Sequence, residues 1–396
     1  MVTEARVQMP QRWANPEILK WARRRMGLQP KDVETLAEIP AERVINWETR
    51  NEVPTLADLE NLAGIYDCPV GYFFLDTPPD TAAVLDFRGL TAEKPEALSY
   101  ETHLSLSEFL RLTDYIASLV ERTGMSREVR IGVADLKEPV QSVAQRERER
   151  LGFTPELRKQ WATPNQAFDF WRSAIEAQGA FVLALKLVPR EVRGASRWDQ
   201  SHPPAILVNR TDMEAATGRT FTLLHEWAHL LVKRPGLVCD FRGQTDGAQL
   251  EHFSNRFAAE VLVPKEEFEH FLKDEELFEK RSRWGDPLLD RIRYNFKVSR
   301  DVVAILLEES GLAAAGFYRN KRGTWDERKP FFRGGRGAER GKTKAMRRLV
   351  EIGLPLSKLV SVAYDRGTVS KLDLADILNM KVEQVEGFVS LVQKQA

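Results

Sequence analysis

Hydrophobic residues recur at helical spacing along residues 1–76, in four short amphipathic segments separated by glycine, proline and capping residues. The first segment follows Asn15-Pro16, the third opens at Pro40, and the fourth follows Pro54-Thr55. A capping side chain followed by proline at the first helical position is typical of a helix start. The pattern therefore predicts a compact all-helical module at this end of the chain.

After the break at Thr77-Pro78-Pro79, the apolar positions predict longer helices and two strands. Helical spacing returns over residues 99–123, 141–151, 166–177, 220–232, 248–263 and 349–396. The runs AFVLALKLV (180–188) and AILV (205–208) are short, apolar and bounded by turn residues, which indicates strands. We therefore expect an α+β, mostly helical protein with a small sheet.

These changes of pattern predict the domain organisation. We expect a helical N-terminal domain over residues 1–76 and a helical linker region over 77–135. The main α+β domain spans 136–318, a basic glycine-containing segment 319–348, and a C-terminal helical module 349–396.

Composition adds constraints on the class of protein. No apolar run approaches the ~18–20 residues that a membrane-spanning helix needs, and the first ten residues lack the apolar core of a signal peptide. The two cysteines, Cys68 and Cys239, exclude a disulfide framework and an all-cysteine zinc site. We expect a cytoplasmic protein without a membrane partner.

The formal net charge of zero, from 58 basic and 58 acidic residues, hides an uneven distribution. Residues 1–76 carry nine basic and twelve acidic residues, a net charge of −3, whereas residues 319–348 carry twelve and three, a net charge of +9. Phosphate binding draws most of its affinity from basic side chains. This distribution weakens the case for DNA binding by the N-terminal module. The partner of the basic segment stays open.

The most informative segment is TFTLLHEWAHLLV, residues 220–232. His225 and His229 are four residues apart, so on a helix both imidazoles lie on one face and can bind one Zn²⁺. Glu226 lies beside them, where a carboxylate can take a proton from an attacking water. Two core histidines that hydrogen-bond to backbone would show the same spacing, but a third ligand nearby favours the metal.

The third ligand is expected on the next helical stretch, because a catalytic zinc keeps three protein ligands and one open position. Glu251 and Asn255 share one stripe of that helix, so we prefer Glu251 as ligand and Asn255 as its hydrogen-bonding neighbour. His252 is the rival, about 100° round the helix. Mn²⁺ and Fe²⁺ suit the same ligand set.

The N-terminal module resembles the helix-turn-helix domain of phage-repressor-like (Xre-type) regulators, through LKWARRRMGL, VETLAEIPAERVINWETRNEVPT and LENLAGIYDCPVGYFF. In that family the segment that opens at Pro40 is the recognition helix. The resemblance implies Arg43 and Asn46 as the base-reading residues. Docking to another protein, which could itself be a helix-turn-helix protein, is the alternative to binding DNA.

The metal segment resembles the ImmA/IrrE family of metallopeptidases, whose pattern is HExxH followed by E-x-x-A-N-x-F-A-x-x-L-L-M-P. Here the pattern reads HEWAH, then EHFSNRFAAEVLVP from Glu251, with Ser254, Val261 and Val263 as departures that remove no ligand. The resemblance implies a zincin-like, gluzincin-type zinc endopeptidase with His225, His229 and Glu251 as ligands and Glu226 as general base. It also implies a helix-turn-helix repressor as the protein substrate, cut to derepress genes.

Two other functions stay open from the sequence. One is a DNA-binding transcriptional regulator whose metal site is structural or sensory. The other is a toxin–antitoxin component whose metal domain binds a partner. For the oxyanion-stabilising donor that a peptidase needs, the sequence offers Tyr294, His202 and Arg219 without choosing among them.

Overall fold

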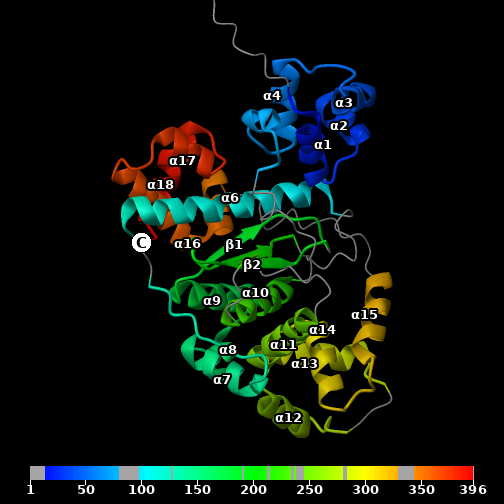
Figure 1. Cartoon of the computed structure of the whole chain (residues 1–396). Helices are drawn as coiled ribbons and strands as arrows, with labels where there is room; N and C mark the ends of the chain where they lie inside the picture. The colour runs from blue at the N-terminus through cyan, green and yellow to red at the C-terminus, as the bar shows by residue number, and fades with distance from the viewer. Residues whose placement is uncertain are drawn as a thin grey trace, which may run out of the picture. The chain divides into compact units, whose positions relative to one another are not determined.

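A computed structural model describes residues 14–79, 98–125, 128–189, 191–211, 215–232, 236–237, 245–279, 283–328 and 343–395. The chain is mostly helical and holds one small sheet (Figure 1). It divides into two compact units, one of Met1–Phe87 with Ala92–Ser107 and the other of Arg88–Thr91 with Glu108–Ala396.

The first unit is all-helical, as predicted. Its helices begin at the predicted caps, since the side chain of Asn15 accepts from the backbone of Glu17 and that of Thr55 accepts from Asp58. Its elements are α1 (Pro16–Arg25), α2 (Pro30–Ala37), α3 (Ala41–Glu48), α4 (Leu56–Ile65) and the 3₁₀ turn η1 (Val70–Phe74). Ile18, Val33, Trp47 and Phe73 are among the residues of their shared core.

The long helix α6 (Tyr100–Thr123) contributes residues to both units. The helices that precede the sheet are α7 (Val140–Arg150), α8 (Pro155–Gln160) and α9 (Pro164–Ala177). Those after it are α10 (Ala215–Leu231), α11 (Thr245–Leu262), α12 (Lys265–Asp274), α13 (Asp286–Phe296), α14 (Arg300–Glu309) and α15 (Phe317–Arg328). The chain then continues through α16 (Lys344–Asp365), α17 (Lys371–Ile377), η3 (Val382–Gln384) and α18 (Val385–Gln393).

The sheet has four strands in the order β1-β3-β2-β4. β1 (Phe181–Leu185) and β3 (Ala205–Asn209) are the two predicted strands, and they pair in parallel. β2 (Gly194–Trp198) pairs antiparallel with β3 and with the short β4 (Gly236–Leu237). The hydrophobic pattern did not predict β2, because its sequence GASRW has no run of β-branched residues.

Both faces of this sheet are covered, which explains why every residue of β1 and β3 is buried. Val182, Ile206 and Val208 belong to the same hydrophobic cluster as α9 and α10. α16 contacts β1, and Figure 1 shows the strands between α16 and the pair α9 and α10. The C-terminal helices are thus a layer of the second unit.

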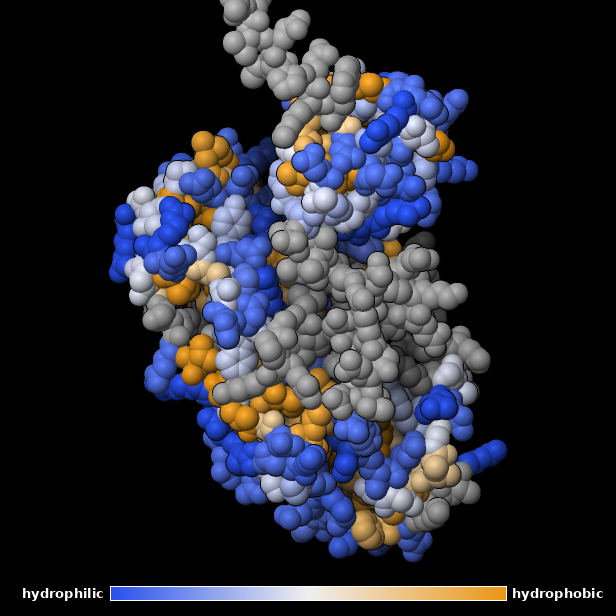
Figure 2. All heavy atoms as spheres, viewed as in Figure 1, coloured by the Kyte–Doolittle hydropathy of each residue, from blue (hydrophilic) through white to orange (hydrophobic). Residues whose placement is uncertain are grey.

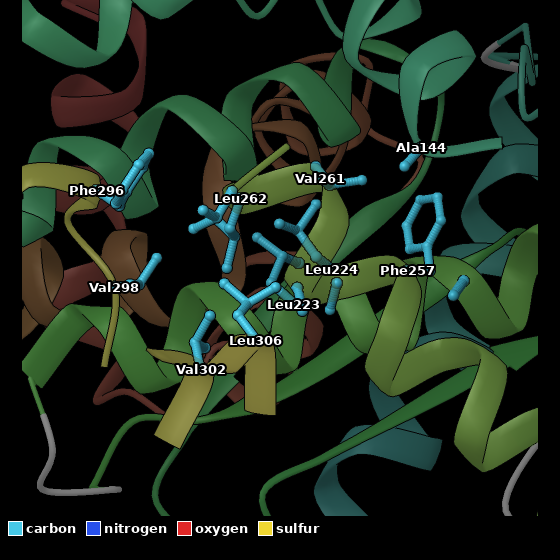
Figure 3. Packing of buried hydrophobic residues seen from close by; sticks show 14 of the residues in the cluster. Ala144, Leu223, Leu224, Phe257, Val261, Leu262, Phe296, Val298, Val302 and Leu306 are labelled. Carbon is cyan, nitrogen blue, oxygen red and sulfur yellow. The ribbon is translucent and has the colours of Figure 1, made fainter. Parts of the chain in front are cut away.

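Buried hydrophobic side chains fix α10 against its neighbours. Figure 3 shows Leu223 and Leu224 of α10 beside Val261 and Leu262 of α11, with Val302 and Leu306 of α14 close by. Ala258 and Ala259 are fully buried on α11. Small side chains at these positions allow α10 and α11 to pack closely, so the two helices hold a fixed register.

The basic glycine-containing segment is described only in part. Its first residues lie in α15 and its last in α16, so these parts are helical. Residues 329–342 lie outside the described residues.

Among the residues that the structure describes, no helix is long and apolar enough to cross a bilayer. Figure 2 shows mainly hydrophilic residues on the coloured part of one face, with scattered hydrophobic ones.

Candidate metal centre

Helix α10 carries His225, Glu226 and His229 within one largely buried stretch of five residues. The Nε2 atoms of the two histidines lie 3.1 Å apart. His229 is almost fully buried, and the side chain of His225 retains 14% of its exposure. The apolar residues around them on α10, such as Trp227 and Ala228, are fully buried. The helix therefore holds its two imidazoles side by side among buried residues, with His225 the more exposed of the two.

Helix α11 brings a carboxylate to these imidazoles. The carboxylate oxygens of Glu251 lie 3.4 Å from Nε2 of His225 and 3.4 Å from Nε2 of His229. One ligand atom from each of the three residues can be chosen so that all three atoms lie within 4.8 Å of one another. Such a group could hold a metal ion. The structure thus brings together the three residues that the sequence analysis selected as ligands.

The spacing of these atoms suits a tetrahedral ion. Zinc binds imidazole nitrogen at about 2.0–2.1 Å and carboxylate oxygen at about 2.0–2.2 Å, so two ligand atoms of a tetrahedral site are about 3.3–3.5 Å apart. The three separations here are 3.1, 3.4 and 3.4 Å. The two 3.4 Å separations go to different oxygens of Glu251, Oε2 for His225 and Oε1 for His229. The two imidazoles and the carboxylate are thus close enough to share one ion such as Zn²⁺, which would keep its fourth position open.

Asn255 orients the first histidine. Its Oδ1 lies 3.1 Å from Nδ1 of His225, one helical turn after Glu251. Because a carbonyl oxygen can only accept, Nδ1 of His225 carries a proton, so in the neutral ring the lone pair is on Nε2, the atom that faces Glu251 and the metal position. Asn255 lies where we expected the hydrogen-bonding neighbour of the ligands.

The same contacts move the pKa values of two of these residues. Burial opposes ionisation of Glu251, but its hydrogen bonds to His225 and His229 and their charge outweigh burial and hold its pKa far below the usual range. Burial lowers the pKa of His225, yet its hydrogen bond to Glu251 and the charges of Glu226 and Glu251 raise it overall. Both pKa shifts mean that these groups together stabilise a positive charge between them, as the ligands of a cation do.

Glu226 is buried on α10 and has a partner that the sequence analysis missed. The hydroxyl of Ser196 on β2 donates to its Oε2 across 2.9 Å. Two residues earlier, Gly194 lies so close to α10 that an added Cβ would be 3.1 Å from Cγ of Glu226. Neither residue carried a signal in the sequence, because β2 itself was not predicted.

A second buried contact holds α10 against helix α7. Nε1 of Trp227 donates to the carboxylate of Glu147 across 3.0 Å, and Arg150 pairs with the other oxygen of that carboxylate at 2.9 Å. Glu147 is almost completely buried. This contact fixes the rotation of α10 one residue after Glu226.

The rival ligand His252 lies on α11 but faces elsewhere. It is exposed and therefore does not share the buried position of His229. Glu260 is buried and accepts a hydrogen bond from the backbone of Lys265, so it caps the start of α12.

The three candidates for the oxyanion-stabilising donor all have other contacts. His202 lies between Asp199 and Asp114, Arg219 donates to Asn165, and the exposed Tyr294 accepts from Arg293. The contacts of these three residues do not select a donor for the metal centre.

The two residues proposed to read bases lie on α3. Arg43 pairs with Glu52 at 3.0 Å and with Asp58 at 3.4 Å, and its guanidinium stands over the ring of Trp47. Asn46 is half-buried, and its carbonyl oxygen accepts from the backbone of Asn51 in the turn after the helix. The charge of Arg43 is thus compensated within the first unit.

The comparisons with known proteins bear on the second unit. Residues 175–308 match the family model of the IrrE N-terminal-like domain, Peptidase_M78. The matched segment contains α10, α11 and the whole His225, His229 and Glu251 group, and it supports a metallopeptidase-type function that uses a divalent metal. No curated protein and no solved structure matches the chain.

Proposed function

We propose that the protein is a zinc-dependent endopeptidase with Zn²⁺ held by His225, His229 and Glu251. The observation that carries the proposal is the convergence of three ligand groups beside the buried carboxylate of Glu226. The two Nε2 atoms lie 3.1 Å apart, and each lies 3.4 Å from an oxygen of Glu251. The match of residues 175–308 to a metallopeptidase family supports it. Three protein ligands leave one position for water and substrate, as catalytic zinc sites do.

When bound, Zn²⁺ supplies Lewis acidity that polarises the scissile carbonyl and lowers the pKa of water. Glu226 takes the proton of the attacking water and later returns it to the leaving amine. The apolar residues around Glu226 exclude bulk solvent, so its carboxylate acts in an environment of low dielectric. His225 is kept in the metal-binding tautomer by Asn255.

For the substrate we propose a helix-turn-helix repressor or an antitoxin-like regulator in the cytoplasm, whose cleavage derepresses the genes it controls. The resemblance to ImmA/IrrE metallopeptidases supports this class. The first unit would recognise that protein. Arg43 is paired with Glu52 and Asp58, and acidic residues outnumber basic ones in residues 1–76, so this surface suits a protein better than a phosphate backbone.

The deciding experiment uses the zinc-loaded full chain and the regulator encoded beside its gene. We expect cleavage by the parent and by Glu266→Gln, an exposed carboxylate of α12, and no cleavage by Glu226→Gln with equal zinc content. An intact regulator in every sample, with one zinc per chain, would rule out the proposed activity.

The alternative is a DNA-binding regulator or toxin–antitoxin component in which the metal site senses or binds a partner. The observation that favours this alternative is the compact helical first unit, in which α2 packs on α3. A retardation assay over a salt series measures the phosphate contacts. A steep loss of DNA affinity with salt, reduced by Arg43→Ala, supports DNA binding.

A further inference from the structure

Strand β2 lies directly against the helix that carries Glu226. Side chains alternate along a strand, so Gly194 and Ser196 share one face of β2. That face contacts α10, since an added Cβ on Gly194 would lie 2.5 Å from Cγ2 of Thr222 and 3.1 Å from Cγ of Glu226. The opposite face carries Arg197, which reaches α6 through Thr113 and Asp114.

Ser196 uses this proximity to bind the carboxylate. Its hydroxyl donates to Oε2 of Glu226 across 2.9 Å, and Ser196 is fully buried. A hydroxyl on a paired strand has one rotatable bond between it and the backbone, so its position is nearly as rigid as the sheet. The long Glu226 side chain is thereby fixed at both ends, by α10 at its Cα and by β2 at its Oε2.

We infer that Ser196 is a positioning residue for Glu226, an inference that rests on the proposed peptidase function. The hydrogen bond occupies one carboxylate oxygen and limits rotation of the group. The lone pairs of the other oxygen stay available for the proton of the attacking water. Gly194 makes the arrangement sterically possible, because any side chain there would push β2 away from α10.

The test needs no peptide substrate, because acetohydroxamate serves as the probe. It chelates zinc through two oxygens and gives up a proton to a neighbouring carboxylate, so its affinity reports on both the metal and Glu226. We measure its dissociation constant for the zinc-loaded full chain. Removing one oriented hydrogen bond by Ser196→Ala is expected to weaken binding about fivefold, with zinc content unchanged.

A double-mutant cycle separates positioning from packing. If Ser196 acts through Glu226, Ser196→Ala has an effect of less than about twofold on a Glu226→Ala background. Equal effects on both backgrounds would overturn the inference, as would parent-like binding by Ser196→Ala.

Two further variants serve as controls. Ser254→Ala removes an equally buried hydroxyl of α11 whose Oγ has no hydrogen-bond partner among the described residues, and it is expected to bind as the parent does. Ser196→Cys keeps a donor, though a weaker one, at the same position, and is expected to lose less affinity than Ser196→Ala. If the alanine variant does not fold, a loss of affinity by Ser196→Cys on the parent background, absent on the Glu226→Ala background, still tests the inference.

The two hypotheses fail in different ways. If the parent binds zinc and acetohydroxamate but cleaves no regulator, the peptidase proposal fails while the cycle still measures the Ser196–Glu226 coupling. If cleavage occurs, Ser196→Ala is expected to lower kcat about fivefold with KM unchanged, because it removes an interaction needed only in the transition state. An unchanged kcat with active parent enzyme refutes the positioning role alone.

Discussion

Nδ1 of His225 donates a hydrogen bond to Oδ1 of Asn255, across 3.1 Å between α10 and α11. The bond selects the tautomer of His225 and orients its ring toward Glu251. Such partners of metal ligands typically contribute 10- to 100-fold to metal affinity. Asn255→Ala is therefore expected to weaken zinc binding by about this factor, measured by competition with a chelator. Ser254→Ala, one residue earlier, should leave the affinity unchanged.

Alanine variants show which of two neighbours on α11, Glu251 or His252, is the metal ligand. Glu251→Ala deletes one of three ligands and is expected to abolish stoichiometric zinc binding. His252→Ala changes an exposed residue and should retain one zinc per chain. Elemental analysis after dialysis measures both. The reverse result, zinc retained without Glu251 and lost without His252, would disprove the ligand assignment.

The hydrogen bond from Trp227 to Glu147 is expected to stabilise the second unit. Trp227→Phe leaves a buried carboxylate oxygen without its donor, which costs about 1–3 kcal/mol in the free energy of unfolding. Trp171→Phe is the matched control, because Trp171 is equally buried and its Nε1 has no partner among the described residues. Urea denaturation of the two variants measures the difference, and equal losses would contradict the prediction.

Gly194 is expected to tolerate no side chain. An alanine Cβ would lie 2.5 Å from Thr222 and 2.9 Å from the carbonyl oxygen of Leu207, so β2 or α10 must move. Overpacking of this kind destabilises by about 1–3 kcal/mol. Gly387→Ala in α18, where an added Cβ meets no atom within 4 Å, should instead stabilise, because alanine is the better helix former. Thermal unfolding of both variants provides the comparison.

Asp290 on α13 makes part of the stability pH-dependent. Hydrogen bonds from Arg300 and Arg293, which outweigh the effect of burial, hold its pKa below the usual value of an aspartate. A depressed pKa stabilises the folded state above the unfolded pKa, and this contribution is lost as the pH falls through the folded pKa. Asp290→Asn should therefore be less stable than the parent at pH 7, with the difference shrinking below about pH 4. Denaturant titrations at a series of pH values test this.

Much of the local structure follows from neighbouring residues along the chain. The caps at Asn15 and Thr55 predicted helix starts because they satisfy backbone donors within one turn. The four-residue spacing of His225 and His229, and of Glu251 and Asn255, predicted shared faces because a helix repeats every 3.6 residues. These signals are local, so no knowledge of packing was needed.

Other features depend on segments far apart in the sequence. Strand β2 is held by β3 and β4 rather than by its own propensity, so Gly194 and Ser196 carried no signal. The pairing of Arg43 with Asp58 likewise joins α3 to the start of α4. Helix α16 covers one face of the sheet through its contacts with β1, which a helical pattern alone does not reveal.

The sequence by itself determined which residues can bind a metal, since ligand type and helical spacing are local properties. Only the tertiary structure decided that Glu251 faces both histidines and that Ser196 holds Glu226. The physical reason is that the packing of α10 against α11 and β2 sets these distances, and that packing depends on the buried residues of the whole unit.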